Sequence, residues 1–172
     1  HPMTRSLPLL LSTLLFAALP AAAQVKTPAT PEKMNQLYAD YWEDYLRENP
    51  IAATFNGDAR YNDRFGVTSS AEGRAQSRAL AEKYLAQTAK FDPSPLPPED
   101  RISYDLLRYR LQQVLDGLRF PSHLAPVDQF SGLHLMMAQL GSGASTQPFQ
   151  TVQDYDNWLK RAAGYAPAVD NL

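Results

Sequence analysis

The sequence predicts an all-α protein in which long antiparallel helices are followed by an irregular, Pro- and Gly-containing connection before the last helix. Apolar residues recur at helical spacing in several long stretches, and each stretch is bounded by residues that start or stop helices. The composition, 44% hydrophobic and 20% charged over 172 residues, is ordinary for a globular protein. A net charge of −2 indicates no nucleic-acid partner, and the lack of cysteine excludes a disulfide framework and a thiolate site.

Residues 1–23 are expected to be a signal peptide with a short N-terminal extension. Arg5 precedes an apolar run from Leu7 to Leu19 that is short for a membrane span. Small residues follow Pro20, and we expect cleavage after Ala23. An uncleaved anchor is the alternative. The protein is therefore predicted to be periplasmic or secreted, without membrane contact after cleavage, and residues 24–30 are expected to form a disordered lead-in.

The first helix is expected to begin at Pro31, because Thr30 can cap it and proline is favoured at the first helical position. Its apolar stripe is expected to be core and consists of Met34, Leu37, Tyr38, Tyr41, Tyr45 and Leu46. The helix ends where Pro50 disfavours helical geometry at Asn49.

The segment from Asn49 to Phe65 shows neither a helical nor a strand period, so it is predicted to be irregular. Asp58 and Asp63 in it could form a carboxylate pair for acid–base chemistry. Arg60 and Arg64 favour the other interpretation, a salt-bridged turn, because they would keep both carboxylates ionised.

Two further long helices are expected. Ser69 and Glu72 form a capping box before a helix that runs to about Phe91. Residues 92–98 contain four prolines and are predicted to be a stiff, extended connection. The next helix spans residues 99–118 and has a core face of Leu107, Leu111, Val114, Leu115 and Leu118.

Residues 122–150 are predicted to be the irregular connection, in which only residues 133–140 could form a short helix or strand. Thr151 and Asp154 then cap a helix that bears Val152, Tyr155, Trp158 and Leu159 and stops near Gly164. A further helix is expected to start at Tyr165. It lacks a stop signal, so residues 31–172 are expected to be the N-terminal helical segment of a larger, truncated helical protein.

No residue of this sequence is predicted to be catalytic or to bind metal. His123 and His134 lack the further ligands that a metal site requires. The candidates for substrate binding are Asp128, Gln129 and His134, because they gather in a loop between helices, where binding residues are common.

An ordered set of short motifs, spread over residues 34–172, resembles the family known as domain of unknown function 885. These motifs are Tyr41-Trp42, Asn49-Pro50, Ala53-Thr54, Gly57-Asp58-x-Arg60-Tyr61, Glu99-Asp100-Arg101, Tyr104-Asp105-Leu106-Leu107, Phe120-Pro121, Pro126, Asp128-Gln129, Gly132-x-His134, Pro148-Phe149, Thr151-Val152 and Asp154-Tyr155.

The resemblance implies a helical protein, exported or cytosolic and much longer than this chain, with a His-Glu-x-x-x-Gly-His type motif in its C-terminal half. It implies a metallopeptidase-like hydrolase in which zinc-bound water attacks the carbonyl of a peptide substrate. The motif is missing here, so zinc is expected in the full-length protein and no cofactor in this chain. The expected function is a non-catalytic N-terminal segment of an exported zinc-dependent peptidase-like protein. The alternatives are a small periplasmic helical binding module for a peptide or partner protein, and a short structural protein.

Overall fold

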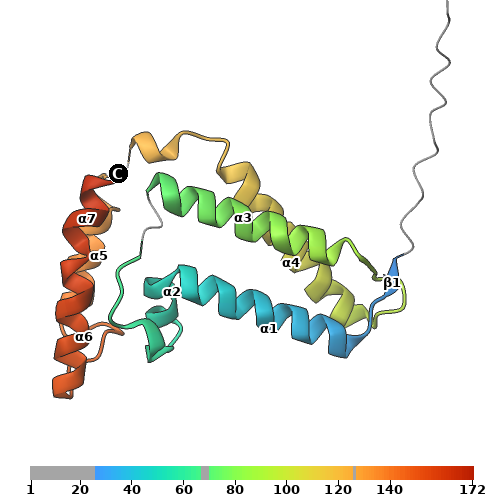
Figure 1. Ribbon diagram of the computed structural model, residues 1–172, viewed down its shortest axis with the longest axis horizontal. Helices are drawn as coiled ribbons and strands as arrows, with labels where there is room; N and C mark the ends of the chain where they lie inside the picture. The colour runs from blue at the N-terminus through green and yellow to red at the C-terminus, as the bar shows by residue number, and fades with distance from the viewer. Residues whose placement is uncertain (1–25, 67–69, 126) are drawn as a thin grey trace, which may run out of the picture.

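A computed structural model describes residues 26–66, 70–125 and 127–172, and in these residues the chain is all-α apart from two very short strands (Figure 1). The predicted fold class is therefore confirmed. The expected signal peptide lies outside the described residues, and export remains a prediction. No helix in the described ranges combines the length and the apolar character needed to cross a lipid bilayer.

Three long helices, α1 (Pro31–Glu48), α3 (Ala71–Thr88) and α4 (Pro98–Gly117), form what we call the helical bundle. In Figure 1, α3 runs antiparallel to both α1 and α4, as expected for this fold. The Thr30 hydroxyl accepts a hydrogen bond from the Lys33 amide, so α1 begins at the predicted residue. At the start of α3, Ser70 is the N-cap and accepts from the Gly73 amide at 3.0 Å, whereas the predicted cap, Ser69, lies outside the described residues.

The prediction of an irregular segment after α1 was wrong in part. Residues Pro50–Phe55 form a short helix, α2, and Ala59–Tyr61 form a 3₁₀ turn, η1. Asn49 has non-helical backbone angles, which separates α1 from α2 and leaves Pro50 at a first helical position, where its fixed φ fits. A helix of six residues spans too few turns for a period to show in the sequence.

The expectation of a disordered lead-in was also wrong for the residues that can be described. β1 (Thr27–Pro28) pairs in parallel with β2 (Phe91–Asp92) through hydrogen bonds from the Thr27 and Ala29 amides, both 2.9 Å. Ala29 is buried next to Met34, Leu96 and Tyr104. These contacts lie at one end of the bundle. α3 ends at Thr88 rather than at about Phe91, because Phe91 belongs to β2.

The bundle core lies between the three long helices. Its buried residues are Leu37 from α1, Leu80, Ala81 and Tyr84 from α3, and Leu107 and Leu111 from α4. The tyrosines Tyr38, Tyr41 and Tyr45 are partly buried against it, as predicted, whereas Trp42 is 41% exposed. The core residues could be predicted from the sequence because each long helix buries one apolar face, and such a face shows as a helical period.

The remaining helices, α5 (Leu133–Gly141), α6 (Val152–Ala163) and α7 (Tyr165–Asp170), form a group that we call the C-terminal arm. The arm lies across the end of the bundle at which α2 is found (Figure 1). The capping box of Thr151 and Asp154 is present as predicted, and α6 ends at Ala163, before Gly164. In the connection before α6, the stretch predicted to form a short helix or strand forms the helix α5, and Ser122–Leu124 form a 3₁₀ turn, η2, that was not predicted.

Candidate functional site

The three predicted substrate-binding residues lie on the surface, and Asp128 shapes its own turn. Its carboxylate accepts hydrogen bonds from the Phe130 and Ser131 amides, both 2.7 Å, and from the Ser131 hydroxyl at 2.8 Å. These bonds, the Phe130 amide first, lower the pKa of Asp128. Gln129 is exposed in the same turn, and His134 is exposed on α5. A role of these three residues in substrate binding stays a prediction.

A pair of adjoining cavities lies between the bundle and the arm, and we call this pair the cleft. The larger cavity, about 380 Å³, lies between the start of α3 and the helices α5 and α7. The smaller, about 300 Å³, lies between α2 and α5. Phe65 and Leu133 line both, so they mark the boundary between the two.

The walls of the cleft are mainly apolar, and most of the polar side chains lie in the larger cavity, with Asn49 in the smaller one. Pro50, Ile51, Ala52, Phe55 and Met136 line the smaller cavity. In the larger cavity the polar side chains are Ser70, Glu72 and Asn171. An apolar pocket with a few polar groups is the usual composition of a site for a small molecule or a peptide side chain.

Phe65 is fixed in place by close contacts from both sides. Its ring meets that of Tyr165 edge-on, with centroids 5.7 Å apart. A Cβ atom added at Gly164 would lie 2.8 Å from the Cβ of Phe65, so glycine is required for this approach. Gly66, at a φ of +91°, turns the chain where Pro50 packs against it. The cleft therefore has a rigid central wall.

Arg161 of α6 attaches the arm to the bundle from within the protein. Its side chain is fully buried. Its guanidinium donates four hydrogen bonds to segment 50–64: to the carbonyls of Arg64 (2.8 Å), Tyr61 (2.7 Å) and Pro50 (3.4 Å), and to Thr54 Oγ1 (2.8 Å). A fifth goes to Gln147 Oε1 (2.6 Å) in the loop before α6. We call this set the Arg161 latch. Because its acceptors come from segments far apart in the chain, it fixes the arm against α2 and η1.

The latch is electrostatically unusual because all five acceptors are neutral. Burial lowers the pKa of Arg161 to about 10, and the Asp63 carboxylate nearby opposes this fall. Guanidinium is the cation best suited to such a site, since its planar fork can satisfy several acceptors and it stays charged. Arg161 was not predicted as a functional residue, because a cation in the last turn of a helix is usually a surface residue that complements the helix dipole.

Asp58 and Asp63 form the ion pairs that the structural interpretation predicted. Asp58 accepts from Arg60 at 2.6 Å, and Arg60 also binds Glu43 of α1 at 2.8 Å. The bond from Arg60 lowers the pKa of Asp58. Asp63 lies 3.7 Å from Arg64. The lowered pKa of Asp58 does not suit a general acid, and its partner Arg60 joins the turn to α1 through Glu43.

The residues described do not fit a zinc site. Within residues 26–66, 70–125 and 127–172 there is no group of three or more His, Cys, Asp or Glu side chains placed to hold a metal ion. His123 lies in η2 and His134 in α5, and neither takes part in such a group. No chemical step through zinc is derived from these residues.

The fold and the site together define an all-helical protein with an apolar cleft between a bundle and an arm. A family model described as bacterial protein of unknown function (DUF885) matches residues 50–172, and the chain belongs to this family. Neither the curated proteins nor the solved structures contain a significant match to the chain. The matched region includes Arg161, every acceptor of the latch and nearly all of the cleft.

Proposed function

We propose that this chain is the non-catalytic N-terminal helical segment of an exported zinc-dependent peptidase-like protein, with the zinc motif outside this chain. Family membership and the resemblance given above support the class of chemistry. The observation that carries the proposal is an apolar stripe that faces solvent. Val152, Tyr155 and Leu159 of α6 are 79%, 54% and 65% exposed.

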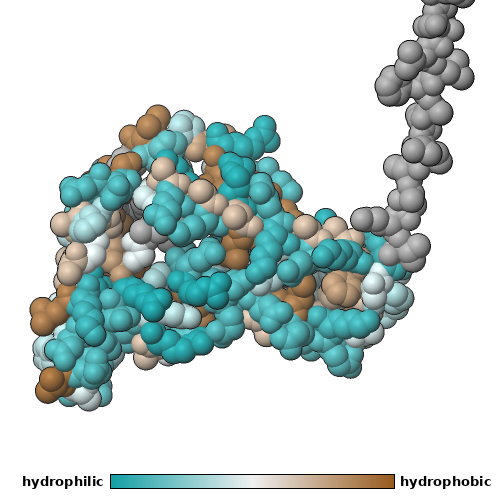
Figure 2. Space-filling view, in the orientation of Figure 1, coloured by the Kyte–Doolittle hydropathy of each residue, from teal (hydrophilic) through white to brown (hydrophobic). Residues whose placement is uncertain are grey.

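The stripe has the spacing of a helix–helix contact. Its residues recur at i, i+3 and i+7, which places them on one face of α6. On the opposite side of the same helix, Arg161 contacts this chain through the latch. Phe149 packs edge-on against Trp158 and also against Tyr155, the middle residue of the stripe, which still leaves Tyr155 more than half exposed. Figure 2 shows the apolar surface at the outer end of α6. Ile102, Leu106 and Tyr109 form a second exposed stripe on α4. Because Leu107 and Leu111 of α4 face the bundle core, α4 is apolar on both sides, which is typical of a helix in the interior of a larger protein.

The first test is the oligomeric state of the chain alone. Full burial of one such side chain is worth about 1.5–3 kcal/mol, so the exposed stripe should drive concentration-dependent self-association. Light scattering after gel filtration should show dimers or larger species, and Leu159→Glu should reduce them. Gln153→Glu, on an exposed polar position of the same helix, is the matched control. A wild-type chain that stays monomeric at high concentration contradicts the proposal.

The second test concerns the gene and its product. A reading frame that continues past Leu172 into a His-Glu helix supports the proposal, and a stop codon there refutes it. The full-length product is then expected to contain zinc and to hydrolyse peptides, whereas this chain alone is expected to be inactive. Full-length protein without zinc or peptidase activity would refute the chemical part while leaving the packing of α6 intact.

The cleft favours a second candidate function, a helical binding module for an apolar peptide segment. Leu133 and Met136 bring the connection between α4 and α6 into the cleft wall, where a ligand would touch it. Leu133→Gln should weaken the binding of apolar peptides or of a hydrophobic dye. Leu135→Gln is the matched control, because Leu135 is 40% exposed on the same helix and does not line the cleft. Equal effects of the two variants would exclude the cleft as the site.

A further inference from the structure

A third cavity, separate from the two of the cleft, opens between the three helices of the bundle. It measures about 50 Å³ and is lined by Tyr41, Tyr45 and Asn49 at the end of α1, by Ser77, Leu80 and Ala81 of α3, and by Arg110, Leu111 and Val114 of α4. We call it the bundle pocket. By the space that one water needs, it holds roughly three or four heavy atoms. That is the size of an aliphatic side chain.

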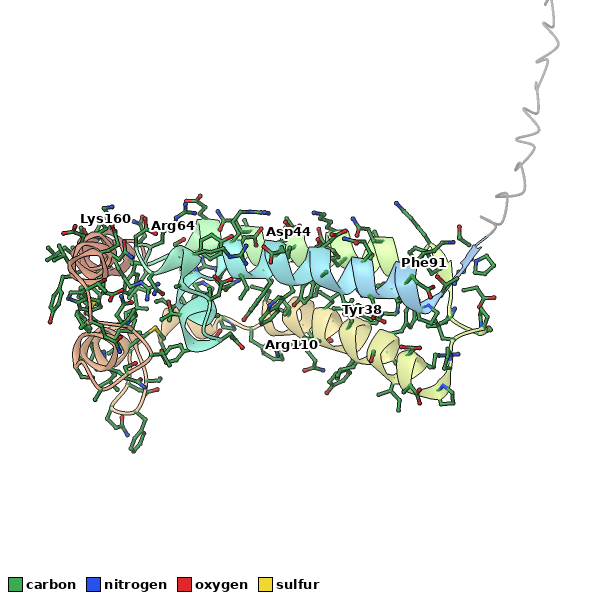
Figure 3. All side chains as sticks on the ribbon, turned by 90° about the horizontal axis from the view of Figure 1, so that it is seen from below. Tyr38, Asp44, Arg64, Phe91, Arg110 and Lys160 are labelled. Atoms are coloured by element: carbon green, nitrogen blue, oxygen red, sulfur yellow. The ribbon has the colours of Figure 1, made fainter. Side chains whose placement is uncertain are left out.

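The floor and the rim of the bundle pocket differ in chemistry. Leu80, Ala81 and Leu111 are buried and give an apolar floor. Tyr41, Tyr45, Ser77 and Arg110 are lining residues that are only partly buried or exposed and can donate hydrogen bonds, and we call them the rim. In Figure 3, Arg110 and Tyr38 are labelled on the side of the bundle where α4 lies beside α1. A ligand would therefore meet apolar contacts below and hydrogen-bond donors above.

The rim has donors in excess and no acid to satisfy them. No aspartate or glutamate lines the pocket. Within the described residues Arg110 makes no ion pair, although Arg101 and Arg119, the arginines nearest the two ends of α4, pair with Asp105 and Asp116. Burial raises the pKa of the Tyr41 hydroxyl, and Arg110 is close enough to oppose that rise. Such a rim is complementary in charge to an anion.

Ring contacts among the aromatic residues of α1 hold this side of the pocket in place. Tyr45 stacks on Trp42 with ring centroids 5.6 Å apart and contacts Tyr41 at 6.0 Å. Asn49 closes the lower end, where its Nδ2 donates to the Tyr45 carbonyl at 2.8 Å. Residues held in place before binding lose little conformational freedom when a ligand arrives.

We propose that the bundle pocket binds the C-terminal residue of a peptide, with its aliphatic side chain on the floor and its carboxylate on Arg110. The guanidinium fork suits a carboxylate because two N–H groups can bind its two oxygens. The Tyr41 and Ser77 hydroxyls are the further donors. The proposal is independent of the proposed function, since it needs neither zinc nor a longer chain.

The test is an NMR titration of the full chain with N-acetyl-L-leucine, which presents the side chain and the carboxylate of a C-terminal leucine. N-acetyl-L-leucinamide is the matched ligand, because it differs only in lacking the charge. We expect saturable shifts in α1, α3 and α4 with millimolar affinity, and binding of the amide at least about tenfold weaker.

Two variants assign the effect to the pocket. Arg110→Gln should weaken binding of the acid about tenfold or more and leave the amide unchanged. Arg101→Gln, at an exposed position on the same helix, should leave both unchanged. Ser77→Leu, which fills the cavity, should abolish binding of both ligands. Circular dichroism establishes that each variant is folded.

Several results would overturn the proposal. These are the absence of saturable shifts at millimolar ligand, equal binding of acid and amide, and an Arg110→Gln variant that binds like the wild type. Shifts confined to the C-terminal arm would place the ligand in the cleft and would also overturn it.

Discussion

Replacing the buried cation of the latch, Arg161→Met, should destabilise the protein strongly because it strands buried acceptors. The Arg64 carbonyl and Gln147 Oε1 have no other donor among the described residues. An unsatisfied buried acceptor costs about 1–3 kcal/mol. Tyr61, Pro50 and Thr54 lose a bond as well, but each keeps another partner.

An opposing contribution comes from the burial of the charge itself. The fall in the pKa of Arg161 to about 10 corresponds to about 3 kcal/mol by which burial disfavours the cation. Methionine removes this penalty and fills part of the space. Set against the loss of five hydrogen bonds, two of them without replacement, the expected net destabilisation is about 3 kcal/mol.

The measurement is the free energy of unfolding by urea at pH 7, followed by circular dichroism. Arg60→Met is the control, because Arg60 lies in the same segment with its side chain 54% exposed, and ion pairs of exposed side chains contribute little to stability. Arg161→Lys should cost nearly as much as Arg161→Met, since lysine keeps the charge but not the planar fork.

Hydrogen exchange adds the location of the effect. In Arg161→Met, amides of α6 and α2 should exchange faster, whereas those at the centre of α3 and α4 should change less. If Arg161→Met loses no more stability than Arg60→Met, or if exchange rises evenly over the whole chain, the latch does not hold the arm to the bundle.

Two further predictions concern the bundle and the cleft. The Lys83 ammonium lies 2.6 Å from the Asp44 carboxylate and is the main cause that lowers the pKa of Asp44 from 3.8 to about 2. The stability that this pair contributes is therefore complete above about pH 4 and is lost as the pH falls toward 2. Asp44→Asn should cost about 1–2 kcal/mol at pH 7 and flatten the loss in that range; an unchanged acid profile would contradict it. Gly164→Ala should cost about 1–3 kcal/mol because its methyl would meet Phe65, whereas Gly117→Ala, with open space around it, should be neutral or slightly stabilising; equal melting temperatures would show that Phe65 can move.

The parts of the fold that were predictable are those in which sequence neighbours decide the structure. The stripe from Met34 to Leu46, the cap at Thr30 and the capping box at Thr151 each depend on residues three or four apart. The lead-in strand was not predictable in this way, because Thr27 finds its partner at Phe91. A two-residue strand carries no period, and only the folded chain brings the two segments together.

The candidate site was harder to predict because it is built from distant segments. The latch acceptors in segment 50–64 lie 97 to 111 residues before Arg161. The sequence predicted the apolar residues that α6 bears, but not that Val152, Tyr155 and Leu159 would be exposed. Helical periodicity shows which residues share a face, but it does not show whether this chain covers that face.

The latch and the cleft are one physical feature rather than two. Arg161 binds the carbonyl of Arg64, and the next residue, Phe65, is the wall between the two cavities. One turn further along the arm, Gly164 packs against Phe65, and the ring of Tyr165 meets it edge-on. A movement of α6 must therefore reshape the cleft. It follows that a loss of ligand binding in Arg161→Met would not show contact with the ligand, because Arg161 is fully buried and lines neither cavity. Leu133→Gln changes a lining side chain without touching the latch, so comparison of the two variants separates the shape of the cleft from its surface.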